Sequence, residues 1–187
     1  MKKIVFVNGS AKRGGATDEM FDLIIKHIDK SVFECKIVNL SEHDIWYCKG
    51  CRVCHETAEC VLSDDMNEIL SSMDSADIVV MISPSYWADI TGQMKVFIDR
   101  CTPYCDTHEP HATLPSGKRG YAVALRTGQN PSECLHIIDS INHFYGHMGI
   151  ADAGSFYLCG IDAVEDVRGR EGQIADFARG IGKWTNI

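Results

Sequence analysis

Residues 3–17 read Lys-Ile-Val-Phe-Val-Asn-Gly-Ser-Ala-Lys-Arg-Gly-Gly-Ala-Thr, and this segment indicates the class of the fold. Its apolar run is unbroken, which is typical of a strand covered on both faces of a parallel sheet. The glycines after Asn8 predict a tight turn, and Met20, Phe21 and Ile24 then recur at helical spacing. A buried strand, a turn and a helix form the opening of a parallel α/β unit.

The same alternation continues along the 187-residue chain. Apolar patterns predict further strands at 35–38, 77–82, 119–125 and 154–158, with helices at about 17–28, 66–73, 91–101, 131–148 and 165–182. We therefore expect an α/β fold built on a doubly wound, five-stranded parallel sheet. The length suits a single domain over residues 1–187, in which residues 41–62 form a cysteine-rich insertion without periodicity.

The acidic composition narrows the classes of function. The formal net charge is -8, whereas a protein that binds nucleic acid by neutralising phosphates is normally basic. No apolar run reaches the roughly 18–20 residues of a membrane span, and the N-terminal run is too short for a signal peptide. We expect a cytoplasmic protein that binds neither nucleic acid nor a membrane.

The turn after the first strand carries side chains suited to a phosphate monoester. Ser10 and Thr17 offer hydroxyl groups, and the helix that follows directs free N–H groups at the loop. Lys12 and Arg13 add positive charge. The dinucleotide fingerprint and the P-loop pattern are both absent. The alternative is an ordinary strand-to-helix turn that requires glycine.

Two further loops follow predicted strands, at the edge where open parallel sheets bind ligands. Tyr86 and Trp87 stand in one of them, and adjacent aromatic rings there predict a wall for a flat heterocycle. The alternative is that both rings fold into the core or lie at a subunit interface. Thr127 and Gly128 stand in the other loop, which either closes over the edge of such a ring or is a plain surface loop.

Over nearly its whole length the chain resembles flavodoxin-like FMN proteins and, more closely, the NADPH-dependent FMN reductase and iron–sulfur flavoprotein group. Three stretches carry the resemblance: 9–17, 83–87 with the helix segment that follows, and 48–60. The first resembles the group's phosphate loop, with Lys12 where arginine is usual and Ala16 where asparagine is frequent.

The resemblance implies a flavodoxin-like fold that binds FMN and takes electrons from NAD(P)H. The residues implied in FMN binding are Ser10, Lys12, Arg13, Ala16 and Thr17 at the phosphate, Pro84, Ser85, Tyr86 and Trp87 along the flavin, and Thr127 and Gly128 from the other side. It also implies a homodimer or homotetramer and, as acceptor, a small molecule or a ferredoxin-type protein. No catalytic acid or base is assigned, because hydride transfer to a flavin does not require one.

Four of the nine cysteines lie close together in the chain, at Cys48, Cys51, Cys54 and Cys60. This compact spacing lets three thiolates surround one corner of an iron–sulfur cubane while a fourth completes it. The resemblance implies a [4Fe–4S] cluster that relays electrons between FMN and a partner. A zinc ion on the same four thiolates and a loop of free thiols are the alternatives.

Together these features predict an FMN-dependent oxidoreductase, either an NAD(P)H:acceptor reductase or an electron-transfer flavoprotein. Two other classes compete with it: a flavodoxin-like electron carrier without enzymatic activity, and a metal-binding or metal-sensing protein built on the cysteine loop. A cysteine phosphatase is excluded, because no cysteine is followed by arginine six positions later.

Two pairs outside these motifs have spacings that occur in metal or redox sites. His143 and His147 are four residues apart on a predicted helix, and a solvated or interface face is the alternative. Cys101 and Cys105 are also four apart, where a packing pair at the end of a helix is the alternative to redox activity.

Overall fold

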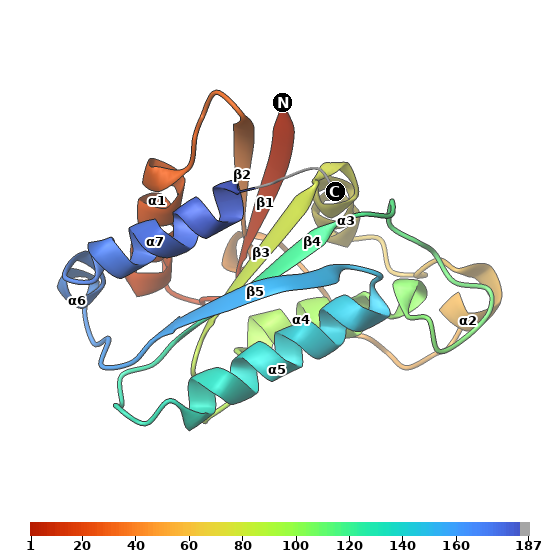
Figure 1. Cartoon of the computed structure of the whole chain (residues 1–187). Coiled ribbons are helices and arrows are strands. Elements are labelled where there is room, and N and C mark those ends of the chain that lie inside the picture. Colours follow the sequence, from red (N-terminus) through yellow and green to blue (C-terminus); the bar gives the residue numbers. More distant parts are fainter. Residues whose placement is uncertain (184–187) are drawn as a thin grey trace.

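The computed structural model describes residues 1–183, and its five strands form one parallel sheet in the order β2-β1-β3-β4-β5 (Figure 1). The strands are β1 (Lys2–Asn8), β2 (Phe33–Asn39), β3 (Ile78–Pro84), β4 (Arg119–Leu125) and β5 (Ala151–Leu158). The predicted doubly wound α/β fold is confirmed.

Helices cover both faces of the sheet (Figure 1). One face packs against α1 (Ala16–His27), α6 (Val164–Arg168) and α7 (Glu171–Gly182), and the other against α3 (Met66–Ser75), α4 (Gly92–Arg100) and α5 (Ser132–His147). Ile4 and Phe6 belong to the first core, and Val5 and Val7 to the second. The apolar run of β1 is unbroken because successive side chains point into opposite cores.

All strands run in the same direction, so the loops that follow them gather at one edge. The register places Asn8 of β1 level with Ile82 of β3, and Pro84 of β3 level with Leu125 of β4. The segments predicted to bind a ligand therefore begin side by side, as the rule for open parallel sheets requires.

The structure departs from the predicted elements in three places. The helix expected at 165–182 is two helices, α6 and α7, with Gly169 and Arg170 between them. Strand β5 begins at Ala151, whereas the predicted strand began at residue 154. Its pairing with β4 shifts register between Gly120 and Tyr121, which the sequence pattern did not indicate. The cysteine-rich insertion contains one short helix, α2 (Cys54–Thr57). Within residues 1–183, none of the helices has the length and apolar character needed to cross a membrane.

Candidate functional site

Asn8, the last residue of β1, organises the loop that was predicted to bind a phosphate. Its buried side-chain nitrogen donates to Asp18 Oδ1 (2.6 Å) and to Asn39 Oδ1 (3.3 Å). Its side-chain oxygen accepts the backbone N–H of Ser10 (3.0 Å), and the Ser10 hydroxyl accepts the N–H of Lys12 (3.2 Å). These bonds fold the loop tightly against the edge of the sheet.

Thr17, in the first turn of α1, has a buried hydroxyl without a hydrogen-bond partner among the described residues. Ala16 opens the helix, and no side chain caps it at Gly15, so the first N–H groups stay available. An unbonded buried hydroxyl costs about 1–3 kcal/mol, which a ligand oxygen would recover. Free N–H groups and a hydroxyl at the start of a helix fit an anion such as a phosphate group.

The two cations of the loop, Lys12 and Arg13, are exposed. Arg13 pairs with Glu42 and, at 3.6 Å, with Asp18, and Asp18 also accepts the N–H of Gly14. In residues 1–183 no ion pair is formed by Lys12. A phosphate at this loop would therefore meet a carboxylate, Asp18, that shares the charge of Arg13 with Glu42, and the ammonium group of Lys12.

The loop after β3 forms a two-residue hairpin that presents aromatic rings to solvent. Tyr86 and Asp89 exchange backbone hydrogen bonds of 3.0 and 3.2 Å. Between them, Trp87 and Ala88 have φ values of 53° and 65°, a conformation that costs on the order of 1–3 kcal/mol for residues other than glycine. Trp87 is 102% exposed and Tyr86 46% exposed. The alternative in which both rings enter the core of this chain is therefore wrong.

A cavity of about 420 Å³ lies between the loops that follow β3 and β4. It is lined by Ser85, Trp87, Ala88, Arg126, Thr127 and Glu133. Glu133, at the start of α5, accepts a hydrogen bond from the hydroxyl of Ser85 (2.6 Å) and forms an ion pair with Arg126 (3.0 Å). The predicted residues Ser85, Trp87 and Thr127 thus meet here, as expected of one binding site.

Sequence reasoning left Arg126 and Glu133 out of the site. The available signal was the position of Arg126, a cation directly after a buried strand. The position of the Arg126 side chain requires glycine at 128, because a Cβ atom there would lie 2.3 Å from Arg126 Nη2. Gly128 and Pro84 flank the cavity: Pro84 ends β3, and the carbonyl of Gly128 accepts the N–H of Gly160 (3.0 Å).

Thr91 ties the predicted phosphate loop to the segment after β3. Its hydroxyl donates to the carbonyl oxygen of Gly9 and accepts the N–H of Met94 (3.2 Å). Its own N–H donates to Ser83 Oγ (3.1 Å), and the N–H of Gly9 donates to the carbonyl of Ile82 (2.9 Å). The loops after β1 and β3 are therefore held together before any ligand binds.

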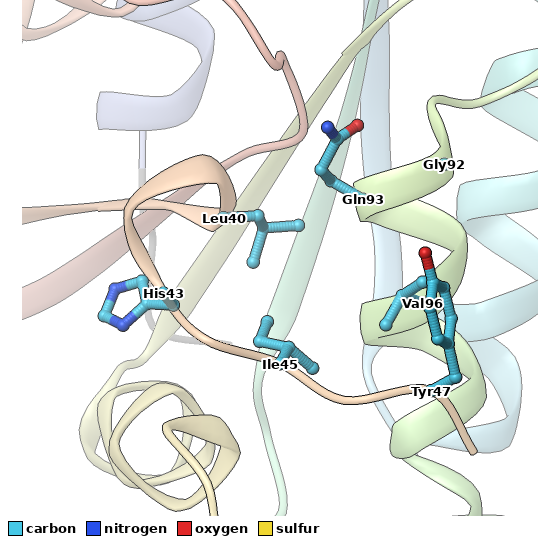
Figure 2. Close-up of a pocket in the computed structure, with 7 residues that line it drawn as sticks. All are labelled: Leu40, His43, Ile45, Tyr47, Gly92, Gln93 and Val96. Carbon is cyan, nitrogen blue, oxygen red and sulfur yellow. The ribbon is translucent and has the colours of Figure 1, made fainter. Parts of the chain in front are cut away.

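A second pocket, of about 240 Å³, lies between the end of β2 and the start of α4 (Figure 2). It is lined by Leu40, His43, Ile45, Tyr47, Gly92, Gln93 and Val96. Leu40 and Ile45 lie between His43 and the side chains of α4 (Figure 2). The sequence did not predict this pocket. One of its lining residues, Tyr47, directly precedes the segment that holds the four clustered cysteines, residues 48–60, called the cysteine segment below.

The cysteine segment closes around a third cavity of about 300 Å³, called the thiol cavity below. Its lining includes Cys48, Cys51, Cys54 and Cys60, with Arg100 from α4 on the opposite wall. The four predicted metal ligands therefore come together. Among the described residues, no three of their sulfur atoms lie within 4.8 Å of one another.

The backbone of this segment takes a left-handed conformation at three positions beside the thiols, of which Cys48, Cys51 and Cys60 are exposed and Cys54 is half-buried. Gly50, Arg52 and Ala58 all have φ near 60°, and the N–H of Gly50 donates to the sulfur of Cys48 at 3.5 Å. N–H groups aimed at cysteine sulfur tune clusters bound through thiolates. Burial raises the pKa of the Cys54 thiol, and the three neighbouring cysteines raise it further.

Two histidines adjoin the thiol cavity. The rings of His55 and His108 are stacked with centroids 3.9 Å apart, and a nitrogen of each lies within 4.8 Å of the sulfur of Cys54. His108 is held in place by the carbonyl groups of Thr102 (3.1 Å) and Pro110 (3.0 Å). Both ring nitrogens of His108 face carbonyl oxygens, which only accept hydrogen bonds, so in this arrangement the ring packs beside the thiols and is not a metal ligand.

Comparison with known proteins places these features in a family. Residues 2–160 match the family model described as NADPH-dependent FMN reductase. An iron-sulfur flavoprotein of Archaeoglobus fulgidus is 35% identical over 155 residues, which are 82% of this chain and 68% of that protein.

Two solved structures show the same fold. A Trp repressor binding protein of Bacillus subtilis superposes with a TM-score of 0.66 and 22% identity, covering 98% of this chain and 99% of that one. An azoreductase of Bacillus anthracis superposes with a TM-score of 0.71 and 14% identity, covering 98% of this chain and all (100%) of that one.

Proposed function

The chain belongs to the NADPH-dependent FMN reductase family, and we propose that it binds FMN across the carboxyl ends of β1, β3 and β4 and passes electrons from NAD(P)H to an acceptor. When bound, FMN supplies the ability to take a hydride from a nicotinamide and to release electrons one or two at a time. The observation that carries the proposal is the buried, unbonded hydroxyl of Thr17 at the uncapped start of α1.

The phosphate group of FMN is proposed to bind at the start of α1. The hydroxyl of Thr17 would donate to a phosphate oxygen, and the N–H of Ala16 would donate to another. Ser10 orders the loop through its bonds to Lys12, and the exposed ammonium of Lys12 is free to balance the phosphate charge. Arg13, at 3.6 Å from Asp18, offsets part of the negative charge of that carboxylate near the phosphate.

The flavin ring is proposed to lie against the hairpin after β3. Tyr86 and Trp87 would cover its apolar face, which would shield both rings from water. Pro84 and Ser85 would border the ring from the end of β3, and Thr127 and Gly128 from the loop after β4. In the cavity between these loops, the Arg126–Glu133 pair would keep both loops in place while the ring enters.

The thiol cavity is proposed to hold a [4Fe–4S] cluster on Cys48, Cys51, Cys54 and Cys60. A tetrahedral zinc ion with Zn–S bonds of about 2.3 Å draws its sulfur ligands to within about 3.8 Å of one another. The cavity of about 300 Å³ that all four thiols line has room for a group larger than a single ion. Such a cluster would let the protein deliver single electrons to a ferredoxin-type protein, besides a small-molecule acceptor.

A homodimer or homotetramer in the cytoplasm is proposed as the working form. Trp87 is fully exposed on a strained hairpin, and a large exposed apolar ring of this kind is typical of an interface. A partner subunit over this hairpin would bury the ring and exclude water from the flavin.

The first test is the visible spectrum of protein purified without oxygen, with iron, sulfide, zinc and FMN assayed on the same sample. We expect flavin bands on a broad iron–sulfur absorption and about four irons per chain. Flavin without iron would support a reductase without a cluster, in which the four cysteines are free thiols. Metal without flavin, even after addition of FMN, would favour the metal-sensing alternative.

Rapid bleaching of the flavin by NADH or NADPH then separates the reductase from a carrier that only a protein donor reduces. In Cys51→Ser, iron and electron delivery to ferredoxin should be lost while bleaching by NAD(P)H persists. Cys35→Ser is the matched control, because Cys35 is a half-buried cysteine in β2, away from the thiol cavity.

A further inference from the structure

A cavity of about 680 Å³ runs between α4 and α5. It shares Asp99 and Thr102 with the lining of the thiol cavity, and Asp89 at its other side belongs to the hairpin after β3. Its lining includes three histidines of α5, His136, His143 and His147, and the thiol of Cys105. Three aspartates, Asp89, Asp99 and Asp139, face it with one lysine, Lys95. The excess of carboxylates makes the cavity attractive to cations.

At one end of this cavity, three groups of different chemistry converge. The sulfur of Cys105, a carboxylate oxygen of Asp106 and a ring nitrogen of His147 all lie within 4.8 Å of one another. Nδ1 of His147 is 2.6 Å from Asp106 Oδ1, and the ring of His143 lies one turn earlier on α5, with its centroid 4.7 Å from that of His147.

We propose that Cys105, Asp106 and His147 bind a borderline-soft divalent cation, with zinc as the first candidate. Sulfur, imidazole nitrogen and carboxylate oxygen are the three ligand types that zinc accepts in proteins. His143 or a water molecule would occupy the fourth position, which opens toward the cavity. These three ligands do not form a sequence motif, because Cys105 and His147 are far apart in the chain. His143 and His147 also lack the glutamate that the His-Glu-x-x-His zinc motif requires.

The charges and protons balance on binding. Cys105 would bind as thiolate and release its proton to solvent, and the hydrogen bond that its sulfur now shares with the hydroxyl of Thr107 (3.2 Å) would persist. The ion would take the place of the proton between His147 and Asp106; Nδ1 would lose this proton to solvent, and the neutral ring would keep its hydrogen on Nε2.

A metal ion at this position would have a structural consequence for the proposed cluster site. Cys105 and Asp106 belong to the segment that contains Thr102 and Pro103, which wall the thiol cavity, and His108, whose ring stacks on His55. An ion held by this segment and by His147 would fix it to the end of α5. The site itself does not depend on FMN or on the cluster.

The test uses the full chain purified without oxygen, with its cofactors in place. Zinc is added, unbound metal is removed by dialysis, and zinc per chain is counted by mass spectrometry and its ligands by X-ray absorption at the zinc edge. We expect one zinc per chain with one sulfur ligand at about 2.3 Å and lighter ligands at about 2.0–2.1 Å. Zinc should also raise the melting temperature.

Cys105→Ser and His147→Gln should each weaken zinc binding at least about tenfold and abolish the melting shift, since each removes a ligand. His136→Gln and Cys35→Ser are the matched controls and should behave as wild type. A melting temperature without zinc close to wild type shows that each variant is folded. Zinc that stays in both ligand variants, or that is lost only when the cysteines of the thiol cavity are replaced, would overturn the proposal.

Discussion

Arg100 and Asp64 form an ion pair in which each side chain is only 1% exposed. Arg100 ends α4, and Asp64 follows the cysteine segment in the chain. Arg100 Nη1 also donates to the carbonyl of Trp46 (2.9 Å), and Asp64 Oδ2 accepts the N–H of Trp46 (2.9 Å). The pair therefore fastens both ends of the cysteine segment to the same helix.

Removal of Arg100 should open the thiol cavity. Arg100→Ala leaves the carboxylate of Asp64 buried without its partner, so we expect a loss of about 3–5 kcal/mol in the free energy of unfolding. Iron retention should fall as well, because Arg100 lines the cavity. Urea unfolding and iron analysis check the two effects; the exposed Arg179→Ala is the control, since its pair with Asp176 is at the surface. Equal stability in both variants would contradict this role of the Arg100–Asp64 pair.

The Arg100–Asp64 pair should also make the free energy of unfolding depend on pH. Burial alone would raise the pKa of Asp64, but hydrogen bonds from Arg100, Trp46 and Met66 outweigh it, and the folded pKa lies below the ordinary value of 3.8. The unfolded chain thus takes up the proton first, and stability is present above the ordinary value and lost as pH falls through the folded one.

Urea titrations of the metal-free protein between about pH 6 and pH 3 follow this dependence, because the range spans the ordinary carboxyl pKa. The free energy of unfolding of wild type should fall more steeply than that of Asp64→Asn, which cannot take up a proton. Parallel slopes for the two proteins would show that Asp64 is not responsible.

Thr17→Val should separate ligand binding from folding. The substitution keeps the shape of the side chain and removes the unbonded hydroxyl, so the flavin-free protein should be as stable as wild type or about 1 kcal/mol more stable. FMN affinity should fall about tenfold, a typical value for a bond to a charged group, whereas riboflavin affinity should not change.

Thr91→Val is the matched control for that experiment, because the hydroxyl of Thr91 already bonds to Gly9 and Met94. It should lower the stability of the flavin-free protein. Fluorescence titration with FMN and with riboflavin gives the affinities. If Thr17→Val bound both flavins as wild type does, the phosphate would have to lie elsewhere.

Trp87→Ala should weaken flavin binding without destabilising the fold. The ring of Trp87 is fully exposed on the single chain and contributes nothing to its core, so melting of the flavin-free subunit, measured at a concentration where it is monomeric, should be unchanged. Loss of a stacked ring should cost on the order of 1 kcal/mol of FMN affinity, which is roughly five- to tenfold. Leu135→Ala, an exposed apolar residue of α5, is the control. Unchanged FMN affinity in Trp87→Ala would refute the aromatic wall.

Local patterns in the sequence were enough to predict most of the fold. The unbroken apolar run of β1 predicted a strand between two cores, and the structure divides Ile4 and Phe6 from Val5 and Val7 in that way. The meeting of the loops at one edge follows from the general rule for parallel sheets, whereas the strand order β2-β1-β3-β4-β5 came from the structure. The break between α6 and α7 escaped prediction, because the apolar spacing continues across it.

The sequence by itself also determined which polar groups stand near the ligand edge, since a loop of fixed length after a strand leaves Ser10 or Tyr86 few other places to lie. Only the tertiary structure decided which of these groups lack partners and which distant ones meet. Within residues 1–183 the hydroxyl of Thr17 has no hydrogen-bond partner. Arg100 pairs with Asp64, and Cys105 lies close to His147, because helices and loops far apart in the chain pack together. Contacts between residues far apart in the chain depend on that packing, and no local pattern encodes them.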